Sequence, residues 1–160
     1  MLPKILIPEV AAANANSKAP RVYNANLMTQ PGETAGYALA DHLHAIENHV
    51  ARRLVDYVVA NKQLVSPTVA KRYRAEGAEP VAIDLPALQK SGCKVVLDNL
   101  LDERDVIRHN HKRLAKLLLE EFCCLERRGP RRLKILRGAK TLRRATRSGK
   151  PRRNYRKQDS

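Results

Sequence analysis

The feature that most constrains the fold of this chain is the separation of its charges. Residues 127–160 contain fifteen Lys or Arg side chains and a single acidic one, Asp159, so they carry +14 of the net charge of +15. A segment with this density of like charge repels itself unless a polyanion neutralises it. We therefore expect three parts: an extended N-terminal segment over residues 1–33, a nearly neutral folded body over residues 34–126, and a basic arm over residues 127–160.

Apolar residues recur at helical spacing in two stretches of the body. The first stripe consists of Leu39, Leu43, Ile46, Val50, Leu54 and Tyr57. A second stripe runs from Val96 to Leu125. Steps of three and four residues are typical of an amphipathic helix. The pattern predicts a mainly α fold, in which two long helices, over about 34–62 and 93–128, form an antiparallel pair that buries both stripes.

Two short helices are expected between the long ones. Ser66 followed by Pro67 is a helix start, and Gly77 is a stop. Asp84 is a second capping residue, and Gly92 follows as a second stop. Residues 1–33 contain four prolines, each of which disfavours helix in the residue before it, so we expect an extended strap there.

The basic arm is the main candidate for a binding site. Lys and Arg side chains that neutralise phosphates release counterions, and the guanidinium fork of Arg suits irregular RNA phosphates and unstacked bases. The expected nucleic-acid-binding residues of the arm are Arg127, Arg128, Arg131, Arg132, Lys134, Arg137, Lys140, Arg143, Arg144, Arg147, Lys150, Arg152, Arg153, Arg156 and Lys157, with Tyr155 as a stacking residue. A second basic cluster, expected on the first short helix, adds Lys71, Arg72 and Arg74.

The motifs of common enzymes are missing from the sequence. It contains no G-x-x-x-x-G-K-[ST] or G-x-G-x-x-G phosphate loop, no G-x-S-x-G nucleophile elbow, no Cys-x-x-Cys and no His-Glu-x-x-His. The acidic residues Asp98, Asp102, Glu103 and Asp105 are interpreted as the surface of a charged helix. We therefore expect no catalytic residues, no metal, no cofactor and no enzymatic activity.

Cysteine content and hydropathy bear on the compartment. Three cysteines, of which Cys123 and Cys124 are adjacent, do not make a disulfide framework and indicate reduced thiols. No apolar run approaches the roughly 20 residues that span a bilayer. The sequence predicts an intracellular protein of a reducing compartment, the mitochondrial matrix or the cytoplasm, without membrane insertion.

These observations lead to a function hypothesis with two alternatives. The first hypothesis is a non-catalytic, structural RNA-binding component of a large ribonucleoprotein, most simply a ribosomal protein, with a mitochondrial ribosome as one setting. Its partners would be rRNA, whose phosphates the arm neutralises, and neighbouring proteins. The alternatives are a DNA-binding accessory protein of a phage, plasmid or nucleoid system, and a protein–protein adaptor subunit of a large complex.

Overall fold

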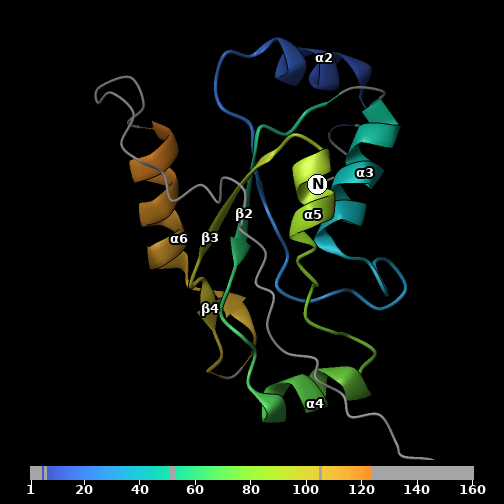
Figure 1. Ribbon diagram of the computed structural model, residues 1–160, viewed down its shortest axis with the longest axis vertical. Coiled ribbons are helices and arrows are strands. Elements are labelled where there is room, and N and C mark those ends of the chain that lie inside the picture. The colour runs from blue at the N-terminus through green and yellow to red at the C-terminus, as the bar shows by residue number, and fades with distance from the viewer. Residues whose placement is uncertain (1–4, 6, 51–52, 105, 124–160) are drawn as a thin grey trace, which may run out of the picture.

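A three-stranded parallel sheet forms the centre of the protein (Figure 1). The structure is a computed structural model that describes residues 5, 7–50, 53–104 and 106–123. The strands are β1 (Val22–Asn24), β2 (Tyr57–Asn61) and β3 (Lys94–Asp98), in the order β1-β2-β3. Both pairings are parallel, so the carboxyl ends of all three strands lie at one edge of the sheet.

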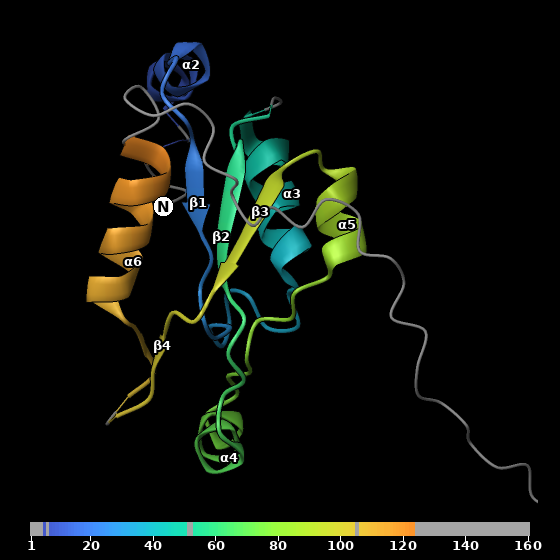
Figure 2. The ribbon, with the colours of Figure 1, turned by 60° about the vertical axis from the view of Figure 1, so that its left-hand side comes forward.

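Helices cover the two faces of this sheet (Figure 2). Helices α3 (Leu39–Val50) and α5 (Leu85–Lys90) lie on one face. Helix α6 (His111–Leu118), which continues into the π-helical turn η1 (Leu119–Cys123), lies on the other. Among the described residues, no helix combines the length and the apolar character needed to cross a membrane.

Two further helices lie at opposite ends of the strands, α2 near their amino ends and α4 near their carboxyl ends (Figure 1). Helix α2 spans Pro8–Asn16 and helix α4 spans Pro67–Ala75. At the amino ends, the Arg21 guanidinium donates two hydrogen bonds to the Asp56 carboxylate, of 2.8 and 2.9 Å. These bonds lower the pKa of Asp56 to about 2 and join the start of β1 to the start of β2.

Strand β2 is the most buried of the strands and helices that the structure describes. Val58 and Val59 are both 0% exposed, and the side chains of successive strand residues point to opposite faces of the sheet. Val58 therefore packs under α3, in a core that also contains Leu39 and Leu43. Val59 packs under α6 with Phe122 and other apolar residues. A strand buried on both faces needs consecutive apolar residues rather than an alternating pattern.

The prediction of a mainly α fold with two long helices is therefore wrong. Helix α3 ends at Val50, and the last part of the predicted helix 34–62 is β2. The predicted helix 93–128 begins as β3, continues through β4 (Leu101–Asp102) and β5 (Arg108–His109), and becomes helical only in α6. The physical reason is that short runs of β-branched residues, which pack well on a pleated surface, also satisfy helical spacing by chance.

The predicted N-terminal strap is wrong as well. Pro8 occupies the first turn of α2, where its missing N–H costs nothing, and β1 pairs inside the sheet. The two short helices are confirmed as α4 and α5. Asp84 caps α5 by accepting a hydrogen bond of 3.2 Å from the backbone N–H of Ala87.

A β-hairpin made by β4 and β5 crosses the carboxyl edge of the sheet. It leaves β3 at one side of the sheet and brings His109 to β1 at the other side, 3.1 Å from the carbonyl oxygen of Ala25. The hairpin is also fixed to α4, because the Tyr73 hydroxyl accepts a hydrogen bond of 2.9 Å from the backbone N–H of Ile107. Residues far apart in the sequence therefore meet at this edge.

Helix α3 buries one histidine in the core. His42 is 8% exposed, and the Tyr23 hydroxyl lies 3.3 Å from its Nδ1 atom. The ring of Tyr37 packs edge-on against the imidazole, and Nε2 is buried without a hydrogen-bond partner among the described residues. Burial lowers the pKa of His42, and the nearby Asp41 opposes this effect only in part.

The core packing leads to a first prediction. Leu43 is 0% exposed under the sheet, whereas Leu64 is 90% exposed. We expect Leu43→Ala to lower the free energy of unfolding by about 2–5 kcal/mol, because the substitution removes buried methyl groups and leaves a cavity. Leu64→Ala removes the same atoms from the surface and should change the free energy by less than about 0.5 kcal/mol. Urea titrations of both variants measure the difference, and equal losses would contradict the assignment of the core.

The buried imidazole leads to a second prediction, on pH. Because the folded state lowers the pKa of His42, the unfolded chain binds more protons as the pH falls below the ordinary value of 6.5. The contribution of the neutral, buried His42 side chain to the free energy of unfolding is therefore complete above that pH and is progressively lost below it. We expect the free energy of unfolding to fall between pH 7 and pH 5, and His42→Gln to flatten this slope. The control is His44→Gln on the same helix, an exposed position that should leave the slope unchanged.

Candidate functional site

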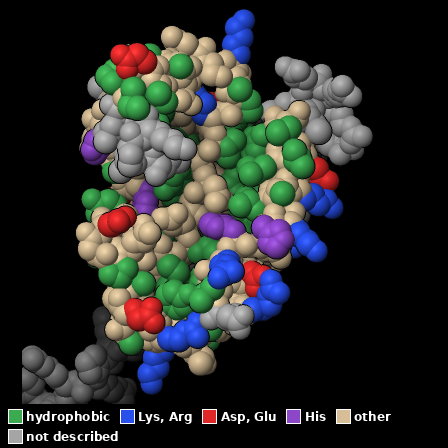
Figure 3. All heavy atoms as spheres, turned by 180° about the vertical axis from the view of Figure 1, so that it is seen from behind, with side chains coloured by type: hydrophobic (Ala, Val, Ile, Leu, Met, Phe, Trp, Pro, Cys, Tyr) green, Lys and Arg blue, Asp and Glu red, His purple; other side chains and the backbone are tan. Residues whose placement is uncertain are grey.

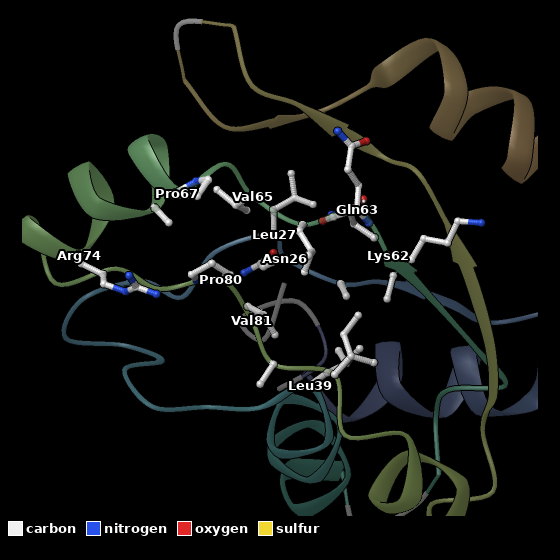
Figure 4. Close-up of a pocket in the computed structure, with 17 residues that line it drawn as sticks. Asn26, Leu27, Leu39, Lys62, Gln63, Val65, Pro67, Arg74, Pro80 and Val81 are labelled. Atoms are coloured by element: carbon white, nitrogen blue, oxygen red, sulfur yellow. Dashed lines mark hydrogen bonds between the residues drawn. The ribbon is translucent and has the colours of Figure 1, made fainter. Parts of the chain in front are cut away.

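A cavity of about 570 Å³ opens at the carboxyl ends of β1 and β2 (Figure 4). In open parallel sheets, ligands bind in the crevice outside the carboxyl ends of the strands, because the loops that follow the strands diverge there. The cavity lies between these loops, helix α4 and the first residue of α3. It is therefore the candidate ligand site of the described part of the chain.

One wall of the cavity is apolar and its rim is polar. The apolar lining includes Leu27, Leu39, Val65, Pro67, Pro80, Val81 and Ile83. The polar lining consists of Asn26, Asn61, Lys62, Gln63 and Arg74. In Figure 4, Arg74 and Lys62 lie at opposite ends of the lining, with the apolar residues between them. An apolar cavity with a few polar groups at its rim is the usual form of a small-molecule site.

The polar residues reach the cavity because the chain leaves the sheet at this edge. Asn26 follows β1 by two residues, and Lys62 and Gln63 directly follow β2. Arg74 comes from the last turn of α4 and lies 3.8 Å from Glu79, with both side chains more than half exposed. A pair at this distance and exposure is weak, so the guanidinium of Arg74 can bind an anion in the cavity at little cost.

Asn61, the last residue of β2, holds the rim in place. Its Oδ1 atom accepts hydrogen bonds from the backbone N–H groups of Leu100, at 2.9 Å, and Gln63, at 3.1 Å. Its Nδ2 atom donates to the carbonyl oxygen of Gln63 at 2.7 Å. The amide therefore joins the loop after β2 to the segment after β3 and fixes the backbone from which Lys62 and Gln63 project.

Three of the four acidic residues singled out in the sequence have structural partners, and the fourth, Asp105, lies outside the described residues. Asp98 binds Arg113 at 2.7 Å, and the hydrogen bonds from Arg113 lower the pKa of Asp98. Asp102 binds Arg104 at 2.7 Å. Glu103 accepts a hydrogen bond of 2.7 Å from the backbone N–H of Ser66, which fixes the hairpin to the start of α4. The described residues contain no group of acidic, His or Cys side chains that could hold a metal ion.

The predicted nucleic-acid-binding residues fall into two groups. Lys71, Arg72 and Arg74 lie on α4, and of these Arg74 lines the cavity. Those of residues 127–157 lie outside the described residues, so their contacts with phosphate stay a prediction. The same is true of the boundary between body and arm.

Sequence reasoning missed Asn26, Asn61, Lys62 and Gln63. The available signal was a polar residue directly after a short apolar run, as in Val58-Val59-Ala60-Asn61. That signal has meaning only when the run is identified as a strand of a parallel sheet.

Basic side chains also gather outside the cavity. Figure 3 shows histidine side chains in the middle of one face, with Lys and Arg side chains beside them. The hairpin and the start of α6 contribute Arg104, Arg108, His109, His111, Lys112 and Arg113. Within this group Arg104 is paired with Asp102 and Arg113 with Asp98, so the number of basic side chains overstates the positive charge near this edge of the sheet.

Comparisons with known proteins agree with this architecture. Residues 1–101 match the model of the family described as "2-phospho-L-lactate transferase CofD". Similar proteins include a "Putative gluconeogenesis factor" of Nostoc, 42% identical over 125 residues, and the "Gluconeogenesis factor" of Bacillus subtilis, 34% identical over 121 residues. The matches cover 76% and 75% of this chain but 27% and 38% of those relatives, so the chain spans about a quarter to two fifths of their length.

A solved structure gives the same result for the fold. The crystal structure of a member of the UPF0052 family from Bacillus halodurans superimposes with a TM-score of 0.71 at 39% sequence identity. The superposition covers 74% of this chain and 38% of that one.

The comparisons overturn the expected function. The family description names a transferase, so the expectation of a non-catalytic ribosomal or other RNA-binding protein is wrong. The relatives named above are bacterial, and nothing favours a mitochondrial protein. One explanation accounts for the match over residues 1–101, the parallel sheet within that range and the 34–42% identity to several relatives. The chain belongs to the 2-phospho-L-lactate transferase CofD family.

Proposed function

We propose that the cavity at the carboxyl ends of β1 and β2 binds the phosphate-bearing anion that a transferase of this family moves. The observation that carries the proposal is the placement of a guanidinium, Arg74, and three side-chain amides at the rim of the cavity. No acidic side chain lines the cavity among the described residues. The lining is therefore suited to an anion and not to a cation.

The geometry of Arg74 fits such a ligand. 2-Phospho-L-lactate has a phosphate and a carboxylate on a small carbon skeleton, and both groups can accept the paired N–H bonds of a guanidinium. The amides of Asn26 and Gln63 add neutral donors, and Lys62 adds positive charge at the other end of the lining (Figure 4). The apolar wall formed by residues such as Val81 suits the carbon part of a substrate.

The proposal concerns a part of a larger family architecture. This chain matches 38% of the solved relative. The regions of that relative outside the match therefore also bear on the complete reaction. In our proposal this chain provides the anion-binding rim. The named relatives are bacterial, and we place the activity in the bacterial cytoplasm.

A second candidate follows from the names of the relatives. Proteins at 34–42% identity are called gluconeogenesis factors, a name that describes a metabolic role and not a reaction. In this version the cavity binds the same class of anion, and occupancy regulates a partner without turnover. Incubation of the protein with 2-phospho-L-lactate donors and acceptors separates the two candidates, because only a transferase forms product.

The proposal makes a prediction for Arg74. Arg74→Gln removes the charged hydrogen bonds to the ligand, which are worth about 1.5–3 kcal/mol. We expect the Kd for 2-phospho-L-lactate to rise about ten- to a hundred-fold, as measured by isothermal titration calorimetry.

The control is Lys71→Gln on the same helix. This variant also removes one positive charge, at an exposed position that does not line the cavity. Its Kd should stay within about two-fold of the parent value, because exposed charges away from the ligand are screened by salt. Equal losses of affinity in both variants would show that the effect of Arg74 is due to net charge alone. No loss of affinity in either variant would show that the cavity is not the binding site.

A further inference from the structure

We propose that His109 is a positioning residue of this cavity, which holds the rim at the end of β1 through a proton fixed on its Nε2 atom. The part of this inference that concerns ligand affinity rests on the function proposed above. The part that concerns the imidazole itself depends on the geometry of the fold alone.

His109 lies at β5, the second strand of the hairpin that crosses the carboxyl edge of the sheet. Its Nε2 atom is 3.1 Å from the carbonyl oxygen of Ala25 and 3.3 Å from the side-chain amide of Asn24. Asn24 is the last residue of β1 and Ala25 follows it, more than eighty positions before His109 in the chain. One imidazole nitrogen therefore makes two contacts with a single short segment.

The chemistry of the two contacts decides which nitrogen carries the proton. The carbonyl oxygen of Ala25 can only accept, so Nε2 must donate to it, and a neutral imidazole then leaves Nδ1 unprotonated. With Nε2 protonated, the NH₂ group of Asn24 at 3.3 Å would place one donor against another. At the same time the Oδ1 atom of Asn24 is buried and has no partner among the described residues.

One rotation of the Asn24 amide removes the opposition of two donors at Nε2, and it moves the NH₂ group to the buried position that Oδ1 occupied. The oxygen and nitrogen of an Asn side chain are assigned from the hydrogen-bond network around them. With the two exchanged, Oδ1 faces Nε2–H of His109 and gains the partner that it lacks. The Nε2–H group then serves two oxygens of the β1 terminus, those of Ala25 and Asn24.

This contact acts on the cavity because Ala25 lines it. The N–H of Ala25 donates to the carbonyl oxygen of Val59 at 2.9 Å, and its own carbonyl oxygen accepts from His109. Ala25 is thus held by β2 from one side and by the hairpin from the other. Asn26, the next residue, places its side chain at the rim. Loss of the imidazole would release one of the two constraints on the backbone that carries Asn26.

The first test uses the ligand-free full chain. A ¹⁵N-labelled sample gives the tautomer of each histidine from two-bond correlations of its ring nitrogens and carbon-bound protons. At pH 8 we expect the His109 ring to be the Nε2–H tautomer, assigned by comparison with His109→Gln. A ring protonated on Nδ1, or one that averages freely between tautomers, would overturn the proposal whatever the ligand is.

The second test uses 2-phospho-L-lactate as the probe. We expect His109→Ala to raise the Kd at least five-fold, and His109→Gln, whose amide N–H can still donate to the carbonyl oxygen of Ala25, to recover most of the loss. The matched control is His111→Ala, an exposed histidine two residues further along, which should bind as the parent does. Unfolding curves of each variant show whether a loss of affinity reflects a loss of stability. If His109→Ala is destabilised, the Kd of His109→Gln is compared with that of the parent to test the positioning role.

The outcomes separate the two proposals. If the parent protein does not bind 2-phospho-L-lactate, the proposed function fails and the tautomer alone decides the role of His109. If the parent binds and His109→Ala binds equally well, the positioning role is wrong while the proposed function stands. If His109→Ala loses affinity and His109→Gln does not recover it, the donated hydrogen bond is not the cause and the proposal is also wrong.

Discussion

The structure depends on the burial of β2 between two parallel neighbours. Val58 and Val59 are adjacent in the sequence, face opposite sides of the sheet and are both completely buried. Parallel pairing with β1 and β3 requires that the chain cross over between strands, which places α3 and α5 on one face. The same pairing brings all carboxyl ends to one edge. The layers of the fold and the position of the site therefore have a common origin.

The edge of the sheet shows how a small set of polar residues becomes a site. Asn26 and Lys62 are surface residues after separate strands, and they meet because those strands are neighbours. The hairpin then returns across the edge, so that His109 contacts the end of β1. Such a site is made of residues from several loops on a rigid scaffold, and new substrates can be accommodated by changes in the loops.

The charge of the C-terminal segment misled the functional interpretation for a physical reason. A dense cationic segment indicates that the chain can attract a polyanion. This attraction does not depend on how the rest of the chain folds. The relation to a transferase family comes from residues 1–101, which precede that segment. The arm from residue 127 remains a candidate for phosphate contacts, but it does not reveal the chemistry of the body.

Elements whose signals are local can be predicted from the amino-acid sequence alone. Helix α4 begins at Pro67, whose fixed backbone suits the first helical position, and helix α5 follows the cap Asp84, because both signals act within one turn of their own residue. Gly92 ends α5 with a φ of +74°, a conformation that glycine adopts without strain.

The strands and the site, in contrast, depend on contacts between distant parts of the chain. Tyr57 pairs with Lys94, and His109 meets Ala25, across long stretches of chain whose apolar runs fit a helix as well as a strand. The choice between the two is made by burial on both faces of a sheet, and burial is a property of the folded chain as a whole. The cavity follows from that choice, since its lining residues are neighbours in space and not in sequence.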